Sequence, residues 1–179
     1  MSLLRPIVLD ASVAIAVVRD EPGAAAIRAA LDQWSIAGRP LLVPSVFWLE
    51  VVNVLARTHR YAGQDVLHAI HELDEFTLTT IESDRTQVLV TLDLVERFGL
   101  TSYDATYLAL MQIHAGDIAT LDHALARAAG SRAIVLDGRQ RLSEPPAPYE
   151  HDVTWPDYKG ASAYLASLRV EAREAAVSR

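Results

Sequence analysis

The sequence predicts an α/β fold in which helices cover both faces of a parallel β-sheet, followed by a C-terminal helical extension. Short apolar runs rich in β-branched residues alternate with longer amphipathic segments over residues 5–136. Strands that are separated by helical crossovers are typical of a parallel sheet buried on both faces. The chain has 179 residues and a hydrophobic content of 51%, which is enough for one domain with a substantial core.

The elements follow from their apolar patterns and from capping residues. Pro22 and Ser83 favour helix starts, whereas Gly38 and Gly99 favour helix ends. The predicted strands cover residues 5–9, 41–43, 76–81, 118–121 and 133–136. The predicted helices cover 12–18, Pro22 to Gly38, Pro44 or Ser45 to about Thr58, 64–74, Ser83 to Gly99, Thr101 or Ser102 to about His114, and 122–129 after a turn.

The chain is expected to divide into a domain over residues 1–141 and an extension over 142–179. The run Ser143–Pro148 is rich in proline and resembles a linker, and residues 158–176 have the pattern of a surface helix. Trp155 and Tyr158 could stack on nucleic-acid bases, although packing of the extension on its own domain is the favoured interpretation.

Charge and composition exclude several protein classes. The net charge of -7 argues against a general nucleic-acid coat protein but is compatible with a nuclease. The absence of cysteine excludes disulfides and thiolate metal sites. The first apolar stretch is too short to span a bilayer and lacks a signal-peptide cleavage pattern, so we expect a cytoplasmic protein without a membrane partner.

Four acids interrupt apolar runs, where an ionised carboxylate must be paired, protonated or bound to a cation. No lysine or arginine lies within these runs to pair with them. If the four acids converge, they would form a cage for a hard divalent metal ion, and this chemistry points to phosphodiester cleavage. The four are Asp10, Glu50, Asp104 and Asp122.

The predicted topology favours convergence, because open parallel sheets bind ligands at the carboxyl ends of their strands. Asp10 and Asp122 each follow a predicted strand, and Asp104 lies in the first turn of a helix. Each acid also has a simpler interpretation. Asp10 and Asp122 could be N-caps, and Asp104 could favour its helix dipole. Glu50 has no capping role, and its simpler interpretation is an exposed position on a helix.

At these residues the sequence resembles the PIN-domain ribonucleases, and within them the VapC-type toxins of bacterial toxin–antitoxin pairs. The resemblance covers about residues 5 to 137, in four segments that occur in the order of the family. The segments are Ile7-Val-Leu-Asp-Ala-Ser-Val-Ala-Ile15, Pro44-Ser-Val-Phe-Trp-Leu-Glu-Val-Val-Asn-Val-Leu55, Tyr103-Asp-Ala-Thr-Tyr-Leu-Ala-Leu110 and Ala119-Thr-Leu-Asp122.

The resemblance implies a Rossmann-like sheet, a Mg²⁺ or Mn²⁺ site and endonucleolytic cleavage of RNA. It implies that Asp10 and Asp104 bind the metal directly, that Glu50 is a ligand or the base for the attacking water, and that Asp122 completes a second site. Ser12 and Thr120 match hydroxyl positions that would hold a carboxylate or a metal-bound water. A toxin would also have a cognate antitoxin and form a homodimer or a higher assembly.

Other polar residues are further candidates for phosphate contact, for the last acidic position and for a metal site. Arg57, His59 and Arg60 are candidates for phosphate contact at the end of the Glu50 helix, although a solvated helix end is the simpler interpretation. Asp117 competes with Asp122 for the last acidic position, but it precedes the predicted strand and should point away from the site. His68 and His71 lack any zinc motif, so an exposed helix face is favoured over a metal site.

The main alternative is a Mg²⁺-binding receiver domain in which an aspartate accepts a phosphoryl group. Lys159 is the only lysine and lies outside the predicted core, which counts against the receiver. Ser12 stands where a haloacid-dehalogenase-like phosphatase requires aspartate, and no GK[ST] loop is present for a P-loop enzyme. A catalytically idle PIN-like interaction module and a 5′-nuclease acting on DNA are further alternatives.

Overall fold

A computed structural model describes residues 4–136 of the chain. The boundary predicted at residue 141 and the extension beyond it lie outside the described residues. The predicted parallel sheet is confirmed: it has five strands, β1 (Ile7–Leu9), β2 (Leu41–Pro44), β3 (Thr79–Ile81), β4 (Asp117–Thr120) and β5 (Ala133–Val135). All neighbouring strands pair in parallel, in the order β3-β2-β1-β4-β5.

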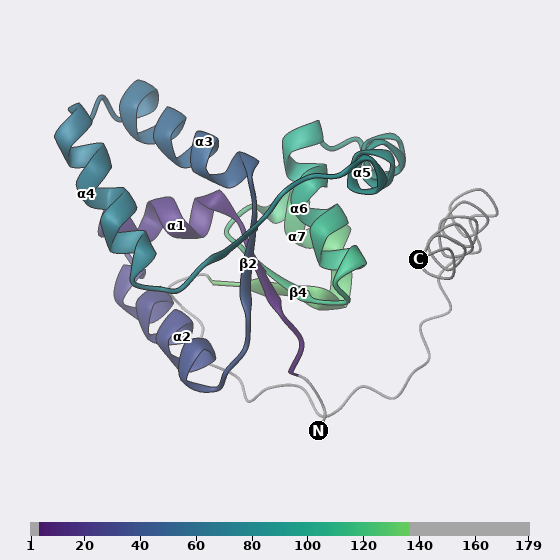
Figure 1. The fold of residues 1–179 in the computed structure, drawn as a ribbon, viewed down its shortest axis with the longest axis horizontal. Coiled ribbons are helices and arrows are strands. Elements are labelled where there is room, and N and C mark those ends of the chain that lie inside the picture. The colour runs from purple at the N-terminus through teal and green to yellow at the C-terminus, as the bar shows by residue number, and fades with distance from the viewer. Residues whose placement is uncertain (1–3, 137–179) are drawn as a thin grey trace, which may run out of the picture. The chain divides into compact units, whose positions relative to one another are not determined.

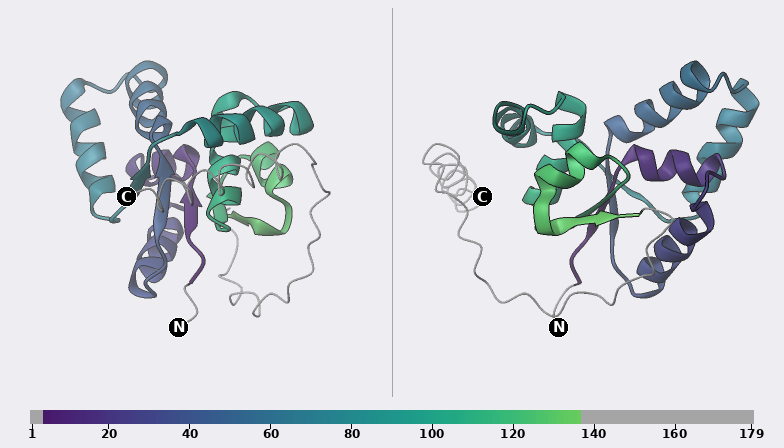
Figure 2. Two further views of the ribbon diagram at one scale, coloured as in Figure 1. Left: turned by 45° about the vertical axis from the view of Figure 1, so that its right-hand side comes forward. Right: turned by 180° about the vertical axis from the view of Figure 1, so that it is seen from behind.

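Helices lie on both sides of this sheet (Figure 1). The helices are α1 (Ala11–Val18), α2 (Ala24–Ile36), α3 (Val46–Asn53), α4 (Gly63–Asp74), α5 (Arg85–Phe98), α6 (Ser102–Ile113) and α7 (His123–Ala129), with a π-helical turn η1 (Val54–Thr58) and a 3₁₀ turn η2 (Gly130–Arg132). Figure 2 shows α1 to α4 on one side of the strands and α5 to α7 on the other. Among residues 4–136, no helix combines the length and apolarity that a membrane span requires.

The core explains why the central strands are continuous apolar runs. All three residues of β1 and all four of β2 are buried, because helices cover both faces of the sheet at its centre. Edge strand β3 has two exposed threonines, which suits a strand with only one neighbour. Helix α6 lies against β1, β2 and β4, and six of its residues are buried. It is therefore the best-buried helix over the site-bearing strands.

Local differences from the predicted boundaries have clear causes. Gly23, not Pro22, is the N-cap of α2, because the chain turns there with a φ of 100° that favours glycine. Asp84, not Ser83, caps α5: its Oδ1 accepts a 2.8 Å hydrogen bond from the Gln87 N–H. Strand β3 is shorter than predicted because the chain turns at Thr77, whose φ is 54°.

The helix predicted to reach Thr58 changes its hydrogen-bonding pattern partway along. Helix α3 ends at Asn53, and the π-helical turn η1 continues to Thr58. A π-helical turn inserts one extra residue per turn, so the residues after it face a different direction from the one that a regular helix would give. Arg57 and the residues after it therefore do not follow the helical phase of Glu50.

Candidate active site

The sheet order brings the candidate acids to one edge. β1 and β4 are neighbours, with Leu9 opposite Ala119, so the segments that follow them start side by side. Asp10 directly follows β1, and its N–H donates a 3.0 Å hydrogen bond to the Ala119 carbonyl oxygen. Asp122 follows β4 by two residues. Parallel strands end at the same edge, which is where open α/β sheets bind ligands.

Asp10 is the most enclosed of the four acids, with 6% of its surface exposed. Its Oδ2 accepts hydrogen bonds from the Ser12 hydroxyl and from Thr120 Oγ1, the latter at 2.7 Å. The hydroxyl of Ser12 also accepts a 3.0 Å hydrogen bond from the Leu121 N–H. Each hydroxyl is thereby oriented, because Thr120 Oγ1 likewise accepts from the Asp122 N–H at 2.9 Å. Asp10 occupies the N-cap position of α1, as the simpler interpretation expects, but its side chain makes no capping hydrogen bond.

The electrostatics of Asp10 reflect both burial and the other acids. Burial raises the pKa of the Asp10 carboxyl, and the hydrogen bonds from Ser12 and Thr120 partly oppose this rise. The negative charges of Asp104 and Asp122 raise the pKa of Asp10 further. Asp104 and Asp122 thus both lie within electrostatic range of Asp10.

Glu50 is half-buried on α3, so its interpretation as a freely exposed position is wrong. Its Oε2 accepts a hydrogen bond from the Tyr107 hydroxyl on α6. Burial raises the pKa of Glu50, the bond from Tyr107 lowers it, and the charges of Asp10 and Asp104 raise it again. All four candidate acids therefore belong to one electrostatic cluster.

Asp104 and Asp122 also perform the local roles expected of helix-terminal acids. Thr101 Oγ1 donates to Asp104 Oδ2 at 2.7 Å and accepts from the Asp104 N–H at 3.1 Å. Asp122 Oδ1 accepts from the N–H groups of Ala124 and Leu125, at 2.6 and 2.9 Å. These bonds satisfy free donors at the starts of α6 and α7. The capping interpretation is correct for Asp122, and it is compatible with a second role at the sheet edge.

The carboxylate oxygens of the four acids suit a hard divalent cation, but the side chains do not surround a single position as the sequence predicted. Within residues 4–136, no three side chains of histidine, aspartate or glutamate are placed closely enough to hold one ion. The same residues contain no ion pair between a basic side chain and any of the four acids. Burial, and to a smaller extent mutual repulsion, raises the pKa values of Asp10 and Glu50, and a cation at this edge would offset both. Oxygen ligands of this kind suit Mg²⁺ and Mn²⁺.

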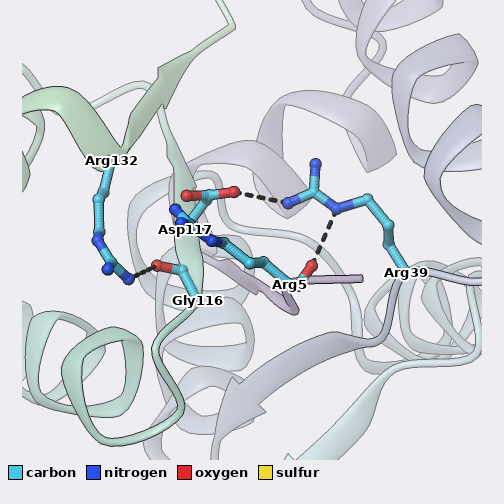
Figure 3. Close-up of polar contacts among 5 residues, drawn as sticks. All are labelled: Arg5, Arg39, Gly116, Asp117 and Arg132. Atoms are coloured by element: carbon cyan, nitrogen blue, oxygen red, sulfur yellow. Dashed lines mark hydrogen bonds and ion pairs between the residues drawn. The ribbon is translucent and has the colours of Figure 1, made fainter. Parts of the chain in front are cut away.

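The competing acid Asp117 lies at the other end of β4, as its first residue rather than before it. Asp117 Oδ2 forms an ion pair with Arg39 Nη2 at 2.6 Å, and Arg39 Nε donates to the Arg5 carbonyl oxygen at 2.9 Å (Figure 3). Arg132 Nη1 donates to the Gly116 carbonyl oxygen at 2.9 Å in the same region. Asp117 therefore connects the amino ends of the strands through Arg39 and does not belong to the cluster of four candidate acids.

The remaining sequence candidates, all among residues 4–136, form no hydrogen bond or ion pair with the four acids. Arg57 and Arg60 are exposed and His59 is half-buried, in or just after η1. His68 is exposed and His71 is exposed on α4, in agreement with the solvated face that was predicted for them. Sequence reasoning missed Tyr107 as a site residue. Its signal was available, because a tyrosine three positions after Asp104 lies on the same helical face and a buried phenol requires a hydrogen-bond partner.

Comparison with known proteins identifies the fold. No curated protein matches the chain. Among solved structures, a toxin–antitoxin complex from Klebsiella pneumoniae matches with a TM-score of 0.57 and 18% sequence identity, covering 73% of this chain and 98% of that chain. PAE2754 from Pyrobaculum aerophilum matches with a TM-score of 0.54 and 21% identity, covering 72% of this chain and 83% of that chain. At these identities the two matches establish a shared fold.

The family assignment comes from the sequence match. The family described as PIN domain matches residues 7–131, which extend from the start of β1 into η2 and contain all four acids. The chain therefore belongs to the PIN-domain family.

Proposed function

We propose that this protein is a divalent-metal-dependent endoribonuclease and the toxin of a VapC-type toxin–antitoxin pair. The observation that carries the proposal is the cluster of four acids around Asp10, whose carboxylate is oriented by two hydroxyls and has no basic partner among the described residues. A buried carboxylate without a basic partner must be protonated or bound to a cation. Membership of the PIN-domain family supports a nuclease.

The ligands of Mg²⁺ or Mn²⁺ would come from the four acids: Asp10 and Asp104 would bind directly, and Asp122 would complete a second site. Glu50 would be a ligand or the base for the attacking water. When bound, the cation would lower the pKa of a water molecule and neutralise charge that develops on the phosphate. Asp10 Oδ2 is occupied by the two hydroxyl bonds, so Oδ1 is the atom that we assign to direct ligation. Ser12 and Thr120 act as supports that hold the Asp10 carboxylate in one orientation.

Glu50 is the residue that we assign to proton transfer. Tyr107 donates to Oε2, so Oε1 is the atom that would accept the proton of the attacking water. The pKa of Glu50 is raised toward neutral pH, and a general base is most effective when its pKa lies near the working pH. Asp104 and Asp122 keep one carboxylate oxygen in local helix contacts, and their charge would help to attract a cation to this edge of the sheet.

The wider assignment follows from this function. Arg57 and Arg60 are exposed cations that would contact the RNA phosphates. The similarity of the fold to a chain of a Klebsiella pneumoniae toxin–antitoxin complex supports a cognate antitoxin as partner. We further propose a homodimer or higher assembly, a cytoplasmic location, and a nuclease domain over residues 1–141 with an extension over 142–179.

The direct test measures cleavage of a mixed RNA pool by the wild-type protein and by Asp10→Asn, with Mg²⁺, with Mn²⁺ and with EDTA. Asp32→Asn is the matched control, because Asp32 is an exposed acid on α2 outside the cluster. We expect metal-dependent cleavage by the wild type and the control and its loss in Asp10→Asn. Equal cleavage by Asp10→Asn, or cleavage that EDTA does not affect, would overturn the proposal.

The receiver alternative is less compatible with the sheet. Receiver domains have the strand order 2-1-3-4-5, whereas this sheet has the order 3-2-1-4-5, with β1 between β2 and β4. Residues 4–136 also contain no lysine for the phosphoryl-transfer site. Labelling of Asp10 by acetyl phosphate, combined with a lack of RNA cleavage, would nevertheless favour the receiver over the nuclease.

A further inference from the structure

The Tyr107 hydroxyl connects two of the acid-bearing segments. The ring is fully buried on α6, yet its hydroxyl donates a hydrogen bond to Glu50 Oε2 on α3. The backbone N–H of Ala11, the residue directly after Asp10 and the first residue of α1, lies near enough to this oxygen to lower the pKa of the phenol. One phenol therefore joins Glu50 to the β1–α1 junction that carries Asp10.

Core packing alone does not account for this hydroxyl. A phenylalanine at position 107 would fill nearly the same volume without placing a polar atom in the core. A buried hydroxyl is costly unless it is hydrogen-bonded, and here the hydroxyl donates to Glu50 Oε2. Burial and the bond to Glu50 raise the pKa of the Tyr107 phenol far above its ordinary value, so the hydroxyl remains a donor throughout the physiological pH range.

The hydrogen bond from Tyr107 restricts the conformation of the Glu50 side chain. Glu50 lies on α3, and long acidic side chains on a helix surface have several rotamers of similar energy. Repulsion from Asp10 and Asp104 would favour rotamers that turn Glu50 away from the other acids. The Tyr107 bond opposes that repulsion, because it stabilises the rotamer in which Glu50 faces the Asp10 junction.

We propose that Tyr107 is a positioning residue, which holds the Glu50 carboxylate at a fixed place relative to Asp10 so that the two acids can act on one cation and one water. This inference rests on the proposed nuclease function for its catalytic consequence. It adds a residue that neither touches the substrate nor binds the cation, and that acts through Glu50.

The test compares Tyr107→Phe with Tyr103→Phe, which removes the same hydroxyl from the same helix at a position that is 58% exposed. For each protein, Mn²⁺ affinity is measured by calorimetry on metal-free protein, and kcat and KM are measured on RNA. We expect Tyr107→Phe to weaken Mn²⁺ binding and lower kcat by about tenfold, because a hydrogen bond to a charged group is lost, with KM little changed. Tyr103→Phe should resemble the wild type.

A double-mutant cycle with Glu50→Gln distinguishes positioning from general structural damage. If Tyr107 acts through Glu50, adding Tyr107→Phe to Glu50→Gln should cause little further loss of Mn²⁺ affinity or of kcat. Equal losses in the two backgrounds would assign Tyr107 to core stability and overturn the inference. Thermal unfolding of the wild type, the two single variants and the double variant identifies any protein that fails to fold.

The two proposals can fail separately. If the wild type cleaves no RNA but binds Mn²⁺, the nuclease function fails, and the cycle on Mn²⁺ affinity still decides the role of Tyr107. If the wild type cleaves RNA but Tyr107→Phe matches Tyr103→Phe in both measurements, only the positioning role fails. If the wild type binds no Mn²⁺ and cleaves no RNA, both fail.

Discussion

Thr120 and Asp10 are 110 positions apart in the chain, yet Thr120 Oγ1 donates a 2.7 Å hydrogen bond to Asp10 Oδ2 in the buried edge of the sheet. Parallel pairing of β1 with β4 creates this contact, since it places the residues that follow Leu9 beside the end of β4. The oxygen of Thr120 also accepts from the Asp122 N–H. One hydroxyl thus links the first and the last acid of the cluster.

Replacing Thr120 with valine should damage both stability and activity. Valine keeps the shape of the side chain but removes the donor to Asp10 and the acceptor for the Asp122 N–H. We expect the free energy of unfolding to fall by about 1–3 kcal/mol, as for the loss of a hydrogen bond to a buried charged group, and RNA cleavage to fall with it. Urea unfolding and single-turnover cleavage measure the two effects. Thr120→Ser, which keeps the hydroxyl, should retain more activity than Thr120→Val, and the reverse order would contradict this role.

The acid cluster should make the metal-free protein less stable as pH rises. Burial raises the pKa values of Asp10 and Glu50, so the folded protein binds these protons more tightly than the unfolded chain does. Their contribution to the free energy of unfolding is complete below roughly pH 4, the ordinary range of carboxyl groups, and is lost as pH rises through the raised folded values.

Asp10→Asn provides the measurement of this pH effect, because asparagine cannot ionise. In EDTA, the variant should gain stability relative to the wild type as pH rises from about 4 to about 8. Urea unfolding at several pH values gives the difference directly. A difference that stays constant over this range would mean that Asp10 ionises as easily in the folded protein as in the unfolded chain.

A divalent cation should stabilise the wild-type protein, because it would offset the repulsion among the negative charges of the four acids. A ligand that binds only the folded state adds about 2.7 kcal/mol when present at about 100 times its Kd. We therefore expect Mn²⁺ to raise the Tm of the wild type, EDTA to reverse the rise, and Asp10→Asn to respond less. An equal rise in the wild type and in Asp10→Asn would indicate that the cation binds elsewhere.

Substitutions at the turn between α6 and β4 should have opposite effects on stability at two adjacent positions. Ala115 has a φ of 51°, which glycine adopts more easily, so Ala115→Gly should add up to about 1 kcal/mol. A Cβ at Gly116 would lie 2.7 Å from the Pro6 carbonyl oxygen, so Gly116→Ala should cost about 1–3 kcal/mol. Thermal unfolding measures both, and RNA cleavage should persist in Ala115→Gly.

Helix and strand periodicity was sufficient to predict the elements, but not every boundary. Asp84 caps α5, although Ser83 was predicted. Both residue types suit an N-cap, and only the backbone conformation in the folded protein decides which of the two occupies that position. The π-helical turn after Asn53 had no signal in the sequence, since its residues are equally compatible with a regular helix. These boundary differences leave all five predicted strands in the sheet.

The sequence by itself determined the α/β class, and it predicted the four candidate acids because each interrupts an apolar run in which a charge is costly. It could not determine which groups would offset that cost. The partners of Asp10 and Glu50 include Thr120 and Tyr107, which are 110 and 57 positions away and become neighbours only through strand pairing and the packing of α6. Local pattern reflects the local energy of each residue, whereas these contacts depend on how distant segments pack, and only the tertiary structure decided them.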